Sequence, residues 1–146
     1  MNNPLLSSFD LVPFQEIEVD HYLPAVHARI LEAKSQISAI VQNPEPPTFS
    51  NTLEALDYSS LALERVSQCF FNLLSAETSQ ELQAKAQEIS PLLSAFKNDV
   101  LMDADLFERI KNVYDHRTSL KLNTEQMRLL ETTYQSFCRN GALLTE

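Results

Sequence analysis

The chain contains a single glycine, Gly141, and this feature restricts the available folds more than any other. The favoured tight turns of β-hairpins need residues that tolerate positive φ angles, and glycine is the commonest of them. A fold with many hairpins is therefore improbable for 146 residues with one glycine. Helix interiors need no such residue, so we expect an all-α fold.

Apolar residues recur at spacings of three and four along most of the chain, which is typical of helices that bury one face. Prolines and capping residues mark where the helices end and begin. These signals predict one domain over residues 1–146, an antiparallel bundle of about five helices at 20–42, 51–77, 79–102, 104–116 and 124–140. Residues 1–19 are predicted to form an extended arm that packs through apolar side chains, namely Leu5, Leu6, Phe9, Leu11 and Phe14.

Local signals refine these helices. Asp20 and Asp103 are expected to cap the first and fourth helices, and Asn123 with Gln126 to open the fifth. Capping boxes are expected from two further pairs, Asn51 with Glu54 and Thr78 with Glu81. Pro91 should kink the third helix, Asp105 should pair weakly with Arg109, and Gly141 should follow the last helix.

The net charge of −9 is concentrated in the first 90 residues, which hold four basic and twelve acidic side chains. No basic stripe is present to neutralise phosphates, so nucleic acid is not an expected partner. An anionic membrane surface is not expected either, and no apolar run is long enough to span a bilayer. The N-terminus lacks the pattern of a signal peptide, which favours a cytoplasmic location.

The residues that carry chemistry are scattered. A zinc helix of the HExxH type needs histidines four apart, whereas His21 and His27 are six apart and His116 is distant. Cys69 lies on an apolar helix beside two phenylalanines, which favours a buried, reduced thiol over a nucleophile. We therefore predict no catalytic, cofactor-binding or metal-binding residue in this chain.

An acidic run near the N-terminus, Glu16, Glu18 and Asp20, has two interpretations. The three carboxylates have the chemistry of a divalent-cation cluster. A solvated acidic arm is the interpretation that we favour. The aromatic residues fall at core spacing and indicate packing first and a ligand surface second.

An ordered series of local motifs is more specific than any of these features. Asn3-Pro4-Leu5-Leu6 is followed by His21-Tyr22-Leu23-Pro24-Ala25, by Pro47-Thr48-Phe49-Ser50-Asn51-Thr52, and by Phe70-Phe71-Asn72-Leu73. In this order the chain resembles the N-terminal helical region of the thimet-oligopeptidase-type zinc metallopeptidases, which include oligopeptidase A and the bacterial peptidyl-dipeptidases. The run from Phe70 to Thr78 looks closer to peptidyl-dipeptidase.

The resemblance implies a parent enzyme that cleaves short peptides at zinc in a deep channel. Its HExxH helix lies far downstream of the region that this chain resembles, so we expect no zinc and no activity in the 146 residues alone. The resemblance further implies that these helices form part of the channel wall, with the rest of the catalytic domain as their partner.

Two interpretations stay open from the sequence. The chain is either the non-catalytic N-terminal region of such a peptidase or a stand-alone helical module that binds a partner protein. The first predicts an exposed apolar patch where the remaining enzyme docks, and hence a weak homodimer of the isolated chain. Leu143 and Leu144 are candidates for that patch.

Overall fold

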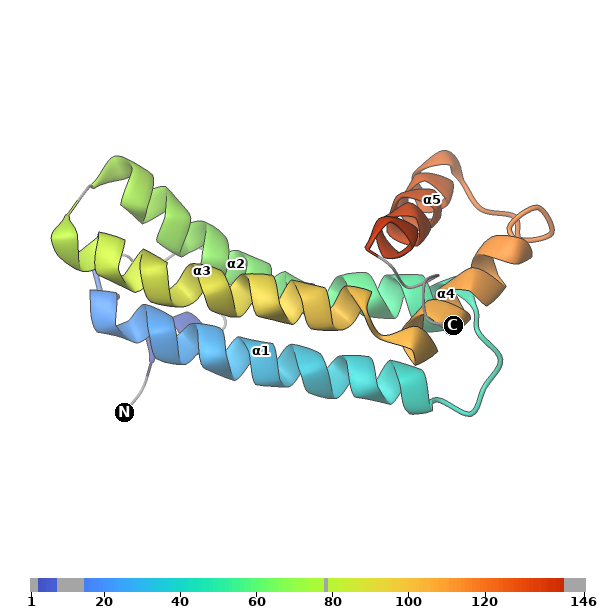
Figure 1. Ribbon diagram of the computed structural model, residues 1–146, viewed down its shortest axis with the longest axis horizontal. Coiled ribbons are helices and arrows are strands. Elements are labelled where there is room, and N and C mark those ends of the chain that lie inside the picture. Colours follow the sequence, from blue (N-terminus) through green and yellow to red (C-terminus); the bar gives the residue numbers. More distant parts are fainter. Residues whose placement is uncertain (1–2, 8–14, 78, 141–146) are drawn as a thin grey trace. The chain divides into compact units, whose positions relative to one another are not determined.

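A computed structural model describes residues 3–7, 15–77 and 79–140, and these residues contain helices and no strand (Figure 1). The element order is η1 (Pro4–Leu6), α1 (Val19–Gln42), η2 (Phe49–Glu54), α2 (Ala55–Ala76), α3 (Gln80–Leu101), α4 (Ala104–Asp115) and α5 (Thr124–Arg139). The predicted all-α fold is confirmed. The helix predicted at 51–77 divides into η2, a short π-helical segment, and α2.

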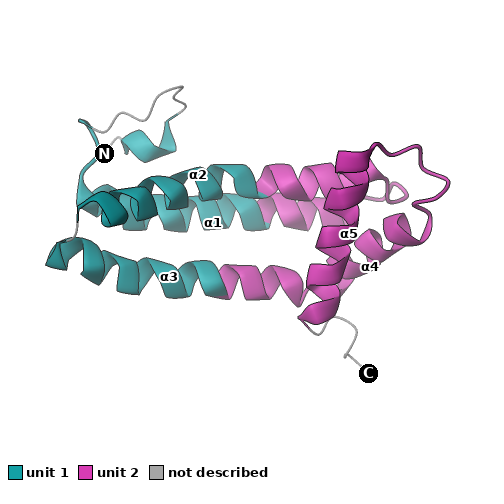
Figure 2. Cartoon of the chain, turned by 90° about the horizontal axis from the view of Figure 1, so that it is seen from above, with its two compact units in different colours: residues 1–34, 60–94 teal, residues 35–59, 95–146 magenta. Residues whose placement is uncertain are grey.

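Contacts divide the chain into two compact units (Figure 2). Unit 1 comprises Met1–Lys34 and Ser60–Ser94, and unit 2 comprises Ser35–Ser59 and Ala95–Glu146. Each unit therefore joins segments that are distant in the sequence. The single domain expected over residues 1–146 stays a prediction. No helix within the described ranges is both long and apolar enough to cross a membrane.

Unit 1 is built from α1, α2 and α3 around a shared apolar core. The Tyr22 ring meets the Phe70 ring edge-on, with centroids 5.1 Å apart, and so joins the start of α1 to the later part of α2. Lys85 Nζ lies 3.5 Å from Asp20 Oδ1 and joins the starts of α1 and α3. The buried apolar side chains of these helices are Tyr22, Ala25, Val26, Ile30, Ala33, Leu63, Val66, Cys69, Phe70, Leu82 and Ile89.

Unit 2 is organised by α4, which packs against α5 and η2. Helix α4 buries four apolar residues on one face, and α5 adds Leu130 and Phe137. This arrangement follows from the spacing of three and four that the sequence shows in both helices. The core of the unit consists of Ile37, Ile40, Phe49, Leu53, Leu101, Leu106, Phe107, Ile110, Val113, Leu130 and Phe137.

Two of the expected helix starts are confirmed. Asp103 caps α4 by accepting the Leu106 N–H, and Asn123 forms a reciprocal capping box with Gln126. In the third helix, the Ser79 hydroxyl accepts the Leu82 N–H at 3.1 Å. The box that was predicted there rests on Thr78, which lies outside the described residues, as does Gly141.

Two expected caps are wrong. Asp20 lies within the first turn of α1 and not before it. Asn51 does not begin a helix, because Thr48 is the cap of η2 and Asn51 occupies the third helical position, where it pairs with Thr48. The capping signal lies three residues earlier than predicted, because Thr48 followed three residues later by Asn51 forms the same reciprocal pattern as Ser or Thr with Glu.

The arm and the proline show smaller differences. Asn3 caps the short 3₁₀ turn η1, so the described start of the arm is not simply extended. Leu5 is buried as expected, whereas Leu6 is exposed, and the arm's other packing residues, Phe9, Leu11 and Phe14, lie outside the described residues. Helix α3 is continuous through Pro91, and the kink at this proline stays a prediction.

Candidate functional site

The histidines do not assemble into a metal site. His21 Nδ1 accepts the Glu18 N–H at 2.9 Å, and His116 Nδ1 lies 2.7 Å from the Asn112 carbonyl oxygen, so each ring closes a local turn of its own. His27 is exposed on α1. Across the ranges 3–7, 15–77 and 79–140, no group of three His, Cys, Asp or Glu side chains is placed to hold a metal ion. The donor set of these residues therefore does not fit zinc.

Cys69 is a buried free thiol on α2. Burial raises the pKa of this thiol, and the charge of Arg65 opposes that shift without cancelling it. A thiol becomes a nucleophile when its pKa is lowered by a base or a positive charge that dominates. Here burial dominates, and the thiol packs as a small apolar group.

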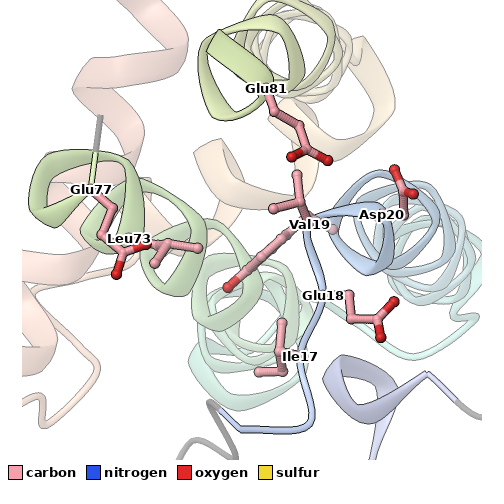
Figure 3. Close-up of a pocket in the computed structure, with 8 residues that line it drawn as sticks. Ile17, Glu18, Val19, Asp20, Leu73, Glu77 and Glu81 are labelled. Carbon is pink, nitrogen blue, oxygen red and sulfur yellow. The ribbon is translucent and has the colours of Figure 1, made fainter. Parts of the chain in front are cut away.

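One cavity of unit 1 lies where the start of α1, the end of α2 and the start of α3 meet (Figure 3). It has a volume of about 630 Å³ and is lined by Ile17, Glu18, Val19, Asp20, Tyr22, Leu73, Glu77 and Glu81. Of the three residues in the predicted acidic run, Glu18 and Asp20 line this cavity and Glu16 does not. The cavity therefore combines carboxylates with an apolar lining.

Tyr22 is the most enclosed member of the cavity lining, with 1% of its surface exposed. Its hydroxyl has no hydrogen-bond partner among the described residues. Burial raises the pKa of Tyr22, and the neighbouring Cys69 adds to the shift, so the phenol stays protonated. A buried hydroxyl without a partner is unusual, because burying a polar group costs free energy unless a hydrogen bond compensates.

A second polar centre lies in unit 2, around the Pro47-Thr48-Phe49-Ser50-Asn51-Thr52 motif. Asn51 Oδ1 accepts the Thr48 N–H at 2.7 Å, and Thr48 Oγ1 accepts the Asn51 N–H at 3.0 Å. Asn51 Nδ2 also donates to the Pro46 carbonyl at 3.0 Å. These bonds close the Pro-rich connection onto the start of η2.

Arg109 of α4 holds the same connection from the other side. Its guanidinium donates to the carbonyl oxygens of Asn43 and Glu45 at 3.1 and 3.4 Å, and to Asn51 Oδ1 at 3.3 Å. The sequence predicted that Arg109 pairs with Asp105. In the structure, the guanidinium of Arg109 instead donates hydrogen bonds to backbone carbonyl oxygens that are distant in the sequence.

An aromatic stack joins α4 to α5. Tyr114 and Tyr134 lie almost parallel with ring centroids 3.9 Å apart, and the Arg117 guanidinium lies 4.0 Å over the Tyr114 ring. Phe107 continues the stack against Tyr134 and Phe137. Such contacts stabilise the pairing of the two helices, in agreement with the packing role that their spacing indicates.

The described residues thus show a polar cavity and a fixed connection but no paired nucleophile and base. Sequence reasoning named Glu18 and Asp20 as an acidic run and Glu81 as a helix-capping residue without anticipating the cavity. It assigned no site role to Glu77 or to the hydroxyl of Tyr22. The available signal for Glu77 was an acidic residue at the C-terminal end of a helix, where the helix dipole disfavours negative charge.

Comparisons with known proteins indicate the relatives of this chain, which its side-chain chemistry alone does not. No family model matches it. It is 38% identical to dipeptidyl carboxypeptidase of Salmonella typhimurium over 99% of this chain and 22% of that protein. Dipeptidyl carboxypeptidase of Escherichia coli is 37% identical over 91% of this chain and 20% of that protein. Oligopeptidase A of Salmonella typhimurium is 28% identical over 97% of this chain and 21% of that protein.

The chain therefore spans about a fifth of the length of the curated relatives that it matches. The match runs along the whole of the chain, so it includes both units and the motifs that carried the resemblance. The chain corresponds to an N-terminal region of the dipeptidyl carboxypeptidase and oligopeptidase A family.

Proposed function

We propose that this chain serves as the non-catalytic N-terminal helical region of a zinc-dependent oligopeptidase or peptidyl-dipeptidase. In this role its helices form part of the wall of the substrate channel and restrict cleavage to short peptides. The observation that carries the proposal is the match to dipeptidyl carboxypeptidases over 91–99% of the chain. The zinc and the residues that hold it belong to another part of the parent enzyme.

The geometry of the described residues supports a scaffolding role. The polar contacts of Arg109 and Asn51 fix a chain connection, and the aromatic stack fixes two helices. Rigid helices suit a wall that excludes large substrates by shape, because such a wall needs packing and not reactive groups. A cytoplasmic location stays a prediction of the same proposal.

The test is a chimera in which this chain replaces the matching region of the Escherichia coli dipeptidyl carboxypeptidase. We expect the chimera to hydrolyse short peptides and to leave a folded protein substrate intact. The chain by itself should hydrolyse neither substrate and should retain no stoichiometric zinc after dialysis. A matched chimera that carries an unrelated helical bundle of similar length is the control.

Two results would contradict this proposal. One is a folded chimera that has no peptidase activity while the isolated chain binds a separate protein partner, as a stand-alone interaction module would. The other is peptide hydrolysis by the isolated chain with zinc bound to its own histidines.

The isolated chain is also expected to self-associate weakly. Several large apolar side chains are exposed, with Leu31 at 68% and Leu61 at 50% in unit 1 and Tyr58 at 69% and Met102 at 56% in unit 2. The candidates Leu143 and Leu144 lie outside the described residues. Because the net charge of −9 opposes association, a homodimer should strengthen as salt screens that charge. Sedimentation across a salt series measures this.

A further inference from the structure

The acidic cavity of unit 1 has a composition that the proposed wall function does not require. Four of its eight lining residues carry carboxylates, namely Glu18, Asp20, Glu77 and Glu81. Lys85 lies within 3.5 Å of Asp20 and balances one of these charges. The cavity therefore presents several negative charges around a volume of about 630 Å³, which is within the usual range for small-molecule sites.

Helix capping explains only some of these carboxylates. Glu18, Asp20 and Glu81 lie at or near the starts of α1 and α3, where negative charge interacts favourably with the helix dipole. Glu77 directly follows α2, and its N–H bonds to the Leu73 carbonyl at the negative end of that helix. A carboxylate at this end is unfavourable in the free protein, and a bound cation would compensate for it.

Tyr22 supplies an independent indication of a ligand. Its side chain lines the cavity, is 99% buried, and carries a hydroxyl that no described residue satisfies. A ligand that donates a hydrogen bond to this oxygen would relieve the cost of burying it alone. The donor must be small enough to enter between the helix ends.

The remaining lining residues indicate the chemistry of the uncharged part of the ligand. Ile17, Val19 and Leu73 give the cavity an apolar surface next to the carboxylates (Figure 3). A bare metal ion would leave this surface unused, whereas an aliphatic chain would pack on it. A ligand that matches this lining is therefore cationic, donates a hydrogen bond, and carries an aliphatic chain next to its charged group.

We infer that this cavity binds a primary alkylammonium group. The ammonium lies between the carboxylates, chiefly Glu77 and Glu81, and donates one hydrogen bond to the Tyr22 hydroxyl, while its methylenes pack on Leu73 and the apolar lining. The same chemistry is offered by the lysine side chain of a peptide and by a free aliphatic diamine. The inference does not rest on the proposed channel wall, and either can fail alone.

The experiment titrates the full 146-residue chain with cadaverine and with the tripeptide Ala-Lys-Ala, using calorimetry and backbone amide spectra. Both tripeptides have an acetylated N-terminus and an amidated C-terminus, so pentanediol and the acetyl-lysine form of the tripeptide are the uncharged controls. We expect both amines, and neither control, to shift the amide signals of Val19, Leu73 and Glu81. The tighter of the two amines identifies the source, free diamine or peptide.

Three variants test the assigned contacts. The rim variant carries Glu77→Gln and Glu81→Gln, and the matched control carries Glu64→Gln and Glu88→Gln, which change the same charge on exposed positions of α2 and α3 outside the cavity. The rim variant should weaken amine binding about tenfold and the control less than about twofold. Tyr22→Phe keeps the ring and should weaken binding about fivefold through the lost acceptor.

The inference is overturned by equal weakening in the rim and control variants, or by unchanged binding in Tyr22→Phe. It is also overturned if Mg²⁺ at the same concentration shifts the same signals equally, because that pattern describes a diffuse acidic surface. Amide spectra of the free variants report whether each has kept its fold. The chimera described above has a separate readout, so failure of one proposal leaves the other measurable.

Discussion

Replacing Arg109 by methionine should loosen the connection between α1 and η2. The change removes three donated hydrogen bonds but keeps an apolar stem of similar length. A bond from a charged donor contributes about 1.5–3 kcal/mol, and only the bond to Asn43, at 3.1 Å and partly buried, has favourable geometry. The other two are long, at 3.3 and 3.4 Å.

One contribution to the free energy of unfolding has the opposite sign. Arg109 Nε is buried without a partner, and methionine removes that unpaired donor. The net expectation is a loss of about 2 kcal/mol in the free energy of unfolding, or a fall of about 4–8 °C in the melting temperature. Thermal unfolding by circular dichroism measures the loss, and faster hydrogen exchange at the Asn51 and Thr52 amides should locate it.

Two further variants make the result interpretable. Arg128→Met removes the same charge from an exposed position of α5 and should change stability by less than about 0.5 kcal/mol. Arg109→Lys keeps the charge but loses the planar set of guanidinium donors, so it should recover less than half of the lost stability. If Arg109→Met is as stable as Arg128→Met and its loop amides exchange at the original rate, the hydrogen bonds to the connection do not carry the stability assigned to them.

Three other predictions follow from single contacts. Asn123→Ala breaks the capping box of α5 and should lower the free energy of unfolding by about 1 kcal/mol in urea titrations, whereas an unchanged midpoint would show that water replaces the cap fully. Tyr22→Phe removes a buried hydroxyl that lacks a partner, so stability should stay the same or rise by about 1 kcal/mol, and a clear loss would mean that the hydroxyl has a partner in solution. Because burial raises the pKa of Cys69, iodoacetamide at pH 8 should alkylate this thiol about tenfold or more slowly than in urea-unfolded protein, as followed by mass spectrometry, and equal rates would contradict its burial.

The sequence was sufficient for the helices because their signals are local. Apolar spacing and caps such as Asp103 and Asn123 act within a few residues, and the structure places both where the pattern predicted them. The cap of η2 was predicted three residues too late because Thr48 and Asn51 form a reciprocal box in which asparagine takes the usual place of glutamate or glutamine.

Long-range contacts were beyond the reach of the same reasoning. Arg109 has an acidic residue four positions earlier, and helix spacing alone favours that pair. Its carbonyl partners Asn43 and Glu45 lie more than 60 residues away, at separations of 66 and 64, where no periodic pattern operates. The cavity is harder still, because it depends on the ends of three helices meeting and on a tyrosine whose hydroxyl is left unpaired.

The way in which the two units divide the chain has a consequence for synthesis on the ribosome. Unit 1 is complete once Ser94 has emerged, whereas residues 35–59 belong to unit 2 and their partners begin only at Ala95. At about 5–20 residues per second, this segment waits several seconds with Ile37, Ile40, Phe49 and Leu53 uncovered. We therefore expect unit 1 to fold first and the nascent chain to carry an apolar segment that a chaperone can bind until α4 and α5 are synthesised and cover it.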